Sequence, residues 1–306
     1  MTTRSRSDVR AGALARRERP RLDAAVAELI RTTKSHARAL ILAGKVRVDD
    51  APATKPGATV ADGARVVVTE SPRYVGRGGE KLEGALRAFA LDVTGTEALD
   101  VGASTGGFTD ALLQHGARHV TALDVGYGQL SWKLRGDPRV TTIERTNFRK
   151  LSDDAFPGGF DLIVVDASFI SLRTIVARAA GYLRKRGAIV ALVKPQFEAG
   201  RERIERGVVR DAAVHAAVLR EVRDAVRTSG LRAVRAAVSP LRGPAGNVEF
   251  FYELRRPDES PPSHHVILSL SKDAPQPPPP LTEITDADID ALVAEAHAAP
   301  PAEHDA

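Results

Sequence analysis

The chain has 306 residues, of which 43% are hydrophobic, enough for one ordinary α/β domain and a small additional module. It contains no cysteine, which excludes disulfides, thiolate metal sites and every mechanism that needs a cysteine nucleophile. No run approaches the roughly 18 consecutive apolar residues of a membrane span, and residues 1–19 lack the apolar core of a signal peptide. We therefore expect a cytoplasmic protein with two domains.

The net charge of +5 hides an uneven distribution of charge along the chain. Residues 257–306 hold ten acidic residues and one basic residue, a net charge of −9, which leaves +14 on residues 1–256. A basic body of this size indicates a polyanionic partner. Nucleic acid is favoured over a membrane surface, because the sequence shows no amphipathic anchor.

The N-terminal part predicts a basic arm followed by a small α+β module. Residues 1–19 show no hydrophobic periodicity, so we predict a flexible arm. In residues 20–70, apolar residues recur at helical spacing over 21–30 and 34–42, and two short strands are expected at 45–49 and 64–68. Such a module is too small for a deep pocket but large enough for a binding surface.

Basic residues of this module predict a surface for a polyanion such as nucleic acid. Arg31, Lys34 and Arg38 follow the spacing i, i+3, i+7 and are expected to share one helical face. Lys45 and Arg47 lie just beyond that face. A basic helix face that is merely solvated is the alternative interpretation of the same residues.

Residues 21–50 resemble the S4 RNA-binding domain. The Arg-Leu-Asp that begins its pattern stands at residues 21–23. The later residues of its pattern, a serine, an alanine, an isoleucine and then Gly-x-Val-x-Val, appear in this order over residues 35–48. The chain departs from the pattern at His36, where the pattern has arginine, and at residues 49–50, which are Asp-Asp instead of Asn-Gly. The expected RNA contacts are Arg21, Arg31, Lys34, Ser35, Arg38, Lys45 and Arg47.

The larger domain is predicted at residues 80–256, after a linker at 71–79. An amphipathic helix over 78–89 precedes strands expected at 98–101, 119–124, 140–144, 162–166, 188–193, 231–238 and 248–254, with helices at 108–114, 172–183 and 211–228 between them. Several strands are apolar throughout, as strands covered on both faces must be. This order predicts an α/β fold with a doubly wound, mostly parallel, Rossmann-like sheet. Residues 257–306 predict a disordered, proline-rich acidic tail with at most a short helix over 286–296.

The segment Ala98–Phe108 joins an apolar strand that ends at Asp100 to a helix through a glycine-rich turn, which indicates a nucleotide-like cofactor. A dinucleotide site needs Gly-x-Gly-x-x-Gly, which this loop lacks. The loop does match the Gly-x-Ser-x-Gly elbow of serine hydrolases at Ser104. However, it follows the first strand of its domain, and outside the tail no histidine stands in an obvious loop after an acidic partner. S-adenosylmethionine is the interpretation that fits the remaining residues.

The expected cofactor site lies at the ends of successive strands. Asp124 is expected to accept hydrogen bonds from both ribose hydroxyls. Asn147 is expected to supply an amide for the adenine edge and Phe148 a ring for its face, although a simple turn residue explains Asn147 equally well. The complete set of expected cofactor contacts is Asp100, Gly102, Ser104, Gly106, Gly107, Phe108, Asp124, Asn147, Phe148 and Asp166.

Residues 20–256 resemble the TlyA family, S4-linked RNA ribose methyltransferases that were historically called hemolysins and whose catalytic domain is similar to FtsJ. The resemblance rests on five motifs, at residues 76–82, 100–108, 165–170, 193–198 and 246–250. FtsJ-like enzymes use a Lys-Asp-Lys-Glu tetrad, and the matching positions are Lys81, Asp166, Lys194 and Glu249. The resemblance implies S-adenosylmethionine as cofactor, ribosomal RNA and ribosomal subunits as partners, and cytidine ribose 2′-hydroxyls as targets.

The chemistry of ribose methylation agrees with such a tetrad. A ribose hydroxyl is a poor nucleophile at neutral pH, so its attack needs a nearby base and an in-line approach. A lysine becomes a base when desolvation or a second cation lowers its pKa, and a neighbouring carboxylate has the opposite effect. We therefore expect Lys194 as the base, Lys81 as the neighbouring cation that steers the hydroxyl, and Asp166 and Glu249 as orienting acceptors.

Other interpretations remain open. Each residue of the tetrad also has a simpler explanation. Taken singly, Lys81 fits a solvated lysine and Asp166 a helix cap, whereas Lys194 fits a charge at the rim and Glu249 an edge-strand carboxylate. Their joint position at strand ends favours a site. A catalytically silent RNA-binding or ribosome-assembly factor would keep the same fold. A membrane-lytic hemolysin, the function that the old family name suggests, lacks an apolar segment here. We expect neither a metal site nor a membrane partner.

Overall fold

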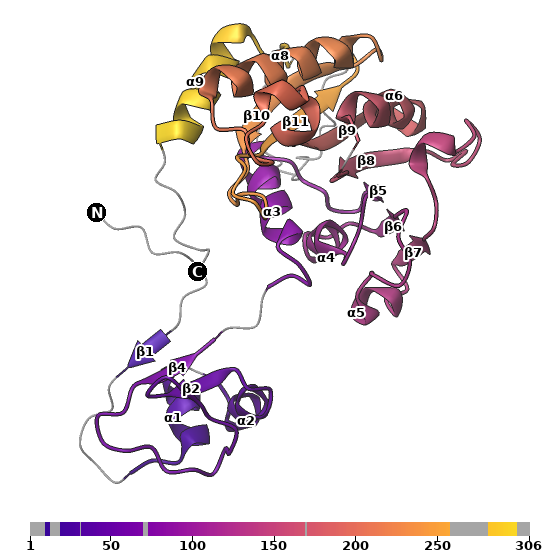
Figure 1. The fold of residues 1–306 in the computed structure, drawn as a ribbon. Coiled ribbons are helices and arrows are strands. Elements are labelled where there is room, and N and C mark those ends of the chain that lie inside the picture. Colours follow the sequence, from indigo (N-terminus) through magenta and orange to yellow (C-terminus); the bar gives the residue numbers. More distant parts are fainter. Residues whose placement is uncertain are drawn as a thin grey trace, which may run out of the picture. The chain divides into compact units, whose positions relative to one another are not determined.

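The computed structural model describes residues 10–12, 19–30, 32–69, 73–168, 170–257 and 281–298. The chain divides into two compact units, residues 1–73 and residues 74–306. Each unit has its own hydrophobic core and is described by itself (Figure 1).

The first unit is a small α+β module. Its elements are β1 (Arg10–Gly12), α1 (Leu22–Leu29), α2 (Lys34–Leu42), β2 (Val46–Val48), β3 (Ala51–Pro52) and β4 (Val66–Val68). The strands pair in the order β1-β4-β2-β3. Leu22, Val26 and Ile41 are fully buried and form its core with valines of the sheet, which confirms the helical periodicity seen in the sequence.

One expectation for this unit is wrong. Strand β1 lies inside the segment predicted to be a flexible arm, because its backbone pairs with β4, and such long-range pairing leaves no local pattern in the sequence. Residues 1–9 and 13–18 of that arm lie outside the described residues. Helix α2 carries Lys34 and Arg38, whereas Arg31, the third residue of the predicted helical face, lies outside the described residues.

The second unit is built on a seven-stranded sheet in the order β10-β11-β9-β8-β5-β6-β7. Its strands are β5 (Glu97–Val101), β6 (His119–Leu123), β7 (Val140–Ile143), β8 (Phe160–Val165), β9 (Leu183–Val193), β10 (Arg232–Val238) and β11 (Phe250–Arg255). Neighbours from β9 to β7 are parallel, whereas β10 and β11 are antiparallel to their neighbours. The predicted doubly wound, mostly parallel sheet is therefore confirmed.

Helices cover both faces of this sheet (Figure 1). Helices α3 (Gly78–Ala88), α4 (Gly107–Gln114) and α5 (Trp132–Arg135) contribute to the core on one face, and α6 (Leu172–Tyr182), α8 (Ala212–Arg227) and α9 (Asp286–Ala298) to the core on the other. Short helical segments α7 (Pro195–Glu198), η1 (Phe148–Lys150) and η2 (Arg201–Arg203) lie in connections. Because helices bury both faces of the sheet, β8 and the second half of β9 consist almost entirely of apolar residues.

The chain enters the sheet at β5, in the middle. It adds β6 and β7 on one side of β5 and then returns to add β8 and β9 on the other side. The connections after β5 and β8 therefore diverge, and open α/β sheets bind their ligands where the strand order reverses in this way.

The second unit begins earlier than predicted. Tyr74 is buried in its core, and α3 starts at Gly78, so part of the predicted linker of residues 71–79 belongs to this unit. A Cβ on Gly79 would lie 2.2 Å from the ring of Tyr74, so only glycine allows this packing. The close contact between ring and helix explains why the linker prediction is wrong at this end.

The tail is more ordered than predicted. The short helix that the sequence allowed over 286–296 is present as α9, and it is an integral part of the fold. Helix α9 buries Ile289, Leu292, Val293 and Ala296 in the core beneath α8 and β10, and Ile284 joins them. This packing was not predicted, because the proline-rich, acidic composition of the tail as a whole indicates disorder. Residues 258–280 and 299–306 lie outside the described residues.

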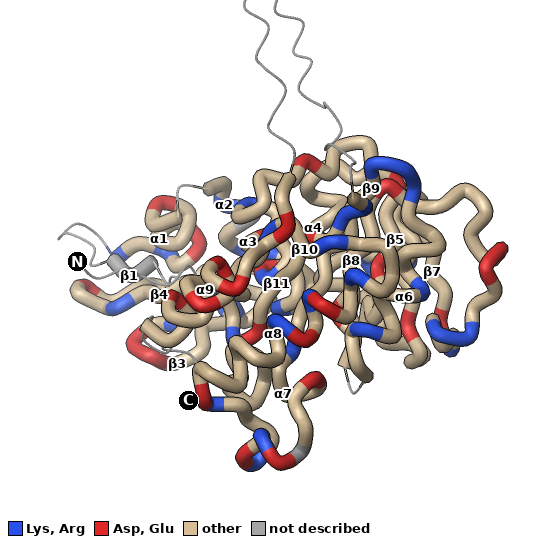
Figure 2. Tube along the Cα trace, turned by 90° about the horizontal axis from the view of Figure 1, so that it is seen from above, with Lys and Arg blue, Asp and Glu red and all other residues tan. Residues whose placement is uncertain are grey.

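The acidic side chains of the tail pair with arginines of α8. Asp286 contacts Arg223 at 2.6 Å, and Asp290 contacts Arg220 at 2.6 Å. Figure 2 shows the red acidic positions along α9 and the blue basic positions of α8. The net charge of the tail is therefore partly neutralised within this unit, a long-range effect that composition alone does not reveal.

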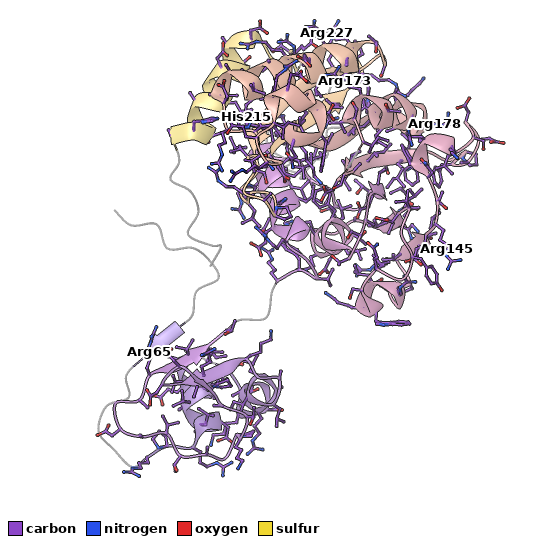
Figure 3. All side chains as sticks on the ribbon, viewed as in Figure 1. Arg65, Arg145, Arg173, Arg178, His215 and Arg227 are labelled. Atoms are coloured by element: carbon purple, nitrogen blue, oxygen red, sulfur yellow. The ribbon has the colours of Figure 1, made fainter. Side chains whose placement is uncertain are left out.

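A pair of histidines adds to the contact between α8 and α9. Nδ1 of the buried His215, labelled in Figure 3, lies 2.9 Å from Nε2 of His297. Burial, reinforced by the neighbouring His297, lowers the pKa of His215 to about 4. The contact is therefore made by a neutral His215 at physiological pH.

Candidate active site at the strand ends

The glycine loop after β5 turns directly into α4. Gly102 and Gly106 have φ angles of 89° and 96°, a left-handed region that favours glycine. A Cβ on Gly102 would lie 2.6 Å from the carbonyl oxygen of Asp166, so the chain segments that leave β5 and β8 are in contact. A Cβ on Gly106 would lie 2.2 Å from the side chain of Leu134 on α5. The glycines thus allow the loop after β5, the chain after β8 and helix α5 to pack closely against one another.

The start of α3 packs on this loop through further glycines. A Cβ on Gly107 would lie 2.9 Å from the backbone nitrogen of Gly79, and a Cβ on Gly76 would lie 2.6 Å from Oγ1 of Thr105. This close packing accounts for the Gly-x-Gly-Gly motif before Lys81. It fixes the helix that carries Lys81 relative to the loop.

Asp100 is fully buried at the end of β5. Its Oδ2 accepts a hydrogen bond of 2.7 Å from Oγ1 of Thr109, while Oδ1 has no hydrogen-bond partner among the described residues. Burial raises the pKa of Asp100 to about 7, although the Thr109 hydroxyl favours the ionised form. A buried acceptor without a partner beside a glycine loop fits a cofactor that donates hydrogen bonds there.

Asp124 follows β6, and its carboxylate connects the glycine loop after β5 to the turn after β6 through hydrogen bonds. Its Oδ2 accepts a hydrogen bond of 2.8 Å from the backbone nitrogen of Ser104, and its Oδ1 accepts one of 2.7 Å from that of Gly126. Ser104 has a φ of 50°, and its hydroxyl donates to Gln129 at 3.4 Å. Because a carboxylate has about four acceptor positions, Asp124 keeps capacity for the ribose hydroxyls that we expect it to bind.

Three expected cofactor contacts also have structural roles. The side chain of Asn147 accepts a hydrogen bond of 3.1 Å from the backbone nitrogen of Arg149, as the turn interpretation requires. The ring of Phe148 is buried and packs edge-on against Tyr182, with ring centroids 5.9 Å apart. Phe108 is buried in the core between α4 and the sheet. The prediction that Phe148 stacks on the adenine is therefore wrong, because a ring in the core leaves no free face.

The four residues of the expected tetrad form two ion pairs. Nζ of Lys81 lies 2.6 Å from Oε2 of Glu249, and Nζ of Lys194 lies 2.6 Å from Oδ1 of Asp166. The side chains of the first pair are 9% and 1% exposed, whereas those of the second are 11% and 23% exposed. The first pair is thus the more deeply buried.

The register of the sheet explains why these residues meet. Phe250 lies opposite Val193, so Glu249 precedes β11 at the edge where Lys194 follows β9, although the two strands are antiparallel. Strand β8 runs parallel to β9, which brings Asp166 to the same edge. Strand ends that are far apart in the sequence therefore share one edge of the sheet.

The pairing differs from the expected arrangement, in which the two lysines are neighbours. Each lysine instead contacts its own carboxylate. This suits the role of Asp166 and Glu249 as orienting acceptors. It also places a carboxylate against the expected base, Lys194, and a carboxylate stabilises an ammonium group.

Sequence reasoning missed two polar neighbours of the tetrad. Oγ of Ser168 accepts a hydrogen bond of 2.9 Å from Nζ of Lys194, and Nε2 of Gln196 donates one of 3.4 Å to Oε1 of Glu249. Each stands two residues after a tetrad member, Asp166 or Lys194. Polar residues at that distance from a functional strand end are a signal that a sequence search can use.

In the first unit, two of the expected RNA contacts also stabilise the fold. Arg21 and Arg38 lie 3.0 Å and 2.9 Å from the buried carboxylate of Asp23. The two guanidinium groups hold the pKa of Asp23 well below its usual range. The other described candidates are exposed or half-buried at the surface of the unit: Lys34, Ser35, Lys45 and Arg47.

The described residues lack a metal-binding cluster and a membrane-spanning helix. No cluster of three or more histidine, aspartate or glutamate side chains there could hold a metal ion. None of the helices in that part of the chain has the length and apolar character needed to cross a membrane.

A Rossmann-like sheet with this glycine loop, preceded by an S4-like module, defines an S-adenosylmethionine-dependent methyltransferase. Residues 74–256 match the family model of FtsJ-like methyltransferases, and residues 20–66 match that of the S4 domain. The 16S/23S rRNA (cytidine-2′-O)-methyltransferase TlyA of Mycobacterium tuberculosis is 50% identical over 244 residues, 78% of this chain and 90% of that protein. The chain therefore belongs to the TlyA family of S4-linked, FtsJ-like methyltransferases.

Other relatives carry the name hemolysin. Hemolysin A of Brachyspira hyodysenteriae is 39% identical over 220 residues, 71% of this chain and 92% of that protein. A solved structure from Streptococcus thermophilus described as a hemolysin is 38% identical, with a TM-score of 0.66, and the match covers 91% of this chain and 96% of the other. Relatives under both names therefore match most of this chain.

The site fits the cofactor of this family. Oδ1 of Asp100 offers a buried acceptor that no other group in the described part of the chain satisfies, and the glycines of residues 102–107 allow a ligand to approach the backbone at the switch point of the sheet. S-adenosylmethionine, when bound, supplies a methyl group activated by a sulfonium sulfur.

Proposed function

We propose that this enzyme methylates ribose 2′-hydroxyls of structured RNA, namely cytidines of the small and large subunit ribosomal RNA, and that it acts in the cytoplasm. The observation that carries this proposal is the edge of the sheet at which Lys81, Asp166, Lys194 and Glu249 lie as two ion pairs. The name of the M. tuberculosis relative supports the choice of RNA and nucleotide. The matched S4 domain and the basic residues 1–256 support a structured RNA.

In the proposed step, the ribose oxygen forms a bond to the methyl carbon and the bond between that carbon and sulfur breaks. The hydroxyl proton passes to Nζ of Lys194. Nζ of Lys194 takes this proton in its neutral form, after one ammonium proton has passed to bulk water, and Oδ1 of Asp166, which lies 2.6 Å from Nζ, then holds the ammonium group that results. Lys81, fixed by Glu249, steers the hydroxyl into line.

The direct test compares ribosomal RNA from strains with and without the gene by mass spectrometry. We expect at least one cytidine ribose methyl to be missing in the deletion strain and to return with the wild-type gene. If both ribosomal RNAs keep every ribose methyl, the proposal fails and the silent RNA-binding factor is favoured. Release of dye from liposomes at physiological salt would instead support a membrane-lytic protein.

The role of Lys194 is tested with purified variants. We expect Lys194→Ala to abolish methyl transfer while S-adenosylmethionine binding, measured by calorimetry, stays within about twofold of wild type. Ser168→Ala, which removes a neighbour of the same ammonium group, serves as the matched control and should keep most of the activity. Unchanged turnover of Lys194→Ala would refute the assignment of the base.

A further inference from the structure

Three large apolar side chains are exposed within the eight residues that directly follow the expected ribose-binding carboxylate, Asp124. Val125, Tyr127 and Trp132 are 69%, 67% and 87% exposed. Only one other large hydrophobic side chain among the described residues, Leu42, has comparable exposure. Exposed apolar side chains that are grouped in this way mark an interaction site rather than ordinary surface.

The position of Trp132 is fixed by its neighbours. It begins the short helix α5, and Leu130 and Leu134 on either side of it are buried against the cofactor loop, where a Cβ on Gly106 would lie 2.8 Å and 2.2 Å from their side chains. The backbone nitrogen of Ser131 donates a hydrogen bond of 3.1 Å to the carbonyl oxygen of Thr105. Trp132 is therefore held at a set place beside the cofactor loop, and its exposure is not the result of a frayed end.

Cations accompany the exposed rings. The guanidinium carbon of Arg145 lies 4.0 Å from the ring centroid of Tyr127, and that of Arg135 lies 6.0 Å from the ring of Trp132. Arg145 is labelled in Figure 3, at the side of the sheet where β7 lies. Exposed rings combined with cations are how proteins bind single-stranded nucleic acid, since every base has a face that stacks and every phosphate is an anion.

We propose that Trp132 stacks on an unpaired nucleobase of the RNA substrate close to the ribose that is methylated. This inference rests on the proposed function and adds the residue that positions the RNA at the catalytic unit. RNA is favoured over an apolar protein surface or a membrane because the rings lie among arginines, and the body of the chain carries a strong positive charge.

Trp132 is the only tryptophan of the chain, so its fluorescence reports directly on its surroundings. The full-length protein is titrated with a short single-stranded RNA and with an abasic RNA of equal phosphate number, and binding is followed separately by the anisotropy of labelled RNA. We expect strong quenching by the first RNA and little by the second. Equal fluorescence with both, under conditions where anisotropy shows binding, would overturn the proposal.

Variants provide an independent test. Trp132→Ala is expected to weaken RNA binding by roughly tenfold or more and to lower kcat/KM for methylation. Trp132→Phe should restore most of both. Leu42→Ala, a change at the other strongly exposed apolar residue, is the matched control and should behave like wild type. All variants should keep the wild-type Tm, because the Trp132 side chain is exposed.

The outcomes separate this inference from the proposed function. If Trp132→Ala binds and methylates RNA like wild type, the stacking proposal is wrong and the enzyme function stands. If the wild type does not methylate RNA but base-dependent quenching occurs, the enzyme function fails and the stacking surface stands. A blue shift of Trp132 emission with anionic phosphatidylglycerol vesicles, without any response to RNA, would assign the surface to a membrane and refute the proposal.

Discussion

The ion pair between Lys81 and Glu249 is almost completely buried, and this burial decides what a substitution does. Removing one member leaves the other charge buried without a partner, which costs about 3–5 kcal/mol. We expect Lys81→Met to lose activity and to lower the Tm. The double variant Lys81→Met/Glu249→Leu should recover much of the Tm but none of the activity. Thermal unfolding and methyl-transfer assays check both, and a double variant less stable than the single one would contradict this account.

Asp100 gives a prediction about pH. Its pKa is about 7 in the folded chain and about 3.9 in an unfolded one, so between these values the folded state holds a proton that the unfolded state lacks. The free energy of unfolding therefore falls as the pH rises from about 4 to about 7, by up to about 4 kcal/mol in all, and changes no further above that range. We expect Asp100→Asn, whose amide oxygen still accepts from Thr109, to raise the Tm relative to wild type at pH 8.5. At pH 5 thermal unfolding should show a much smaller gain, and a pH-independent difference would argue against the buried carboxylate as its cause.

Helix α9 is an integral part of the second unit, although the sequence predicts at most a short helix within a disordered tail there. Each of its large buried side chains contributes about 1.5–3 kcal/mol by leaving water, and Arg223 is buried on α8 with Asp286 as partner. We expect a chain that ends at residue 280 to unfold at a clearly lower Tm. A chain that ends at residue 298 is the matched control and should unfold like wild type. Equal Tm values for the two would show that α9 packs without stabilising the fold.

The elements that the sequence predicts well are those whose evidence is local. Apolar runs and glycine turns place the parallel strands, and since their carboxyl ends share an edge, residues such as Asp166 and Lys194 can be expected to lie together. The direction of a side chain is not local information. Hence the partner of each lysine and the burial of the Phe148 ring could not be read from the sequence. Strand β1 and the packing of helix α9 into the core escaped prediction for the same reason, because distant residues stabilise them.

At the scale of the whole molecule, charge predicts how RNA binding responds to salt. A basic body binds RNA largely by releasing counterions, so affinity falls steeply with ionic strength. Lys34 is a better probe of this than Arg38, which also neutralises the buried Asp23. We expect Lys34→Glu to weaken RNA binding at low salt, to reduce the slope of log K against log salt by about 1 and to leave the Tm unchanged. Filter-binding at several salt concentrations tests this, and an unaltered slope would remove Lys34 from the RNA-binding surface.

The separation of Lys81 from its carboxylate by 168 positions in the chain has a consequence for biosynthesis. The ribosome makes the lysine early and the glutamate near the end of the domain, so a nascent chain exposes the ammonium group to water for most of its synthesis. Contacts between such remote residues form slowly, since a long loop must close first. The newly made enzyme therefore stays inactive until almost its entire catalytic domain has left the exit tunnel.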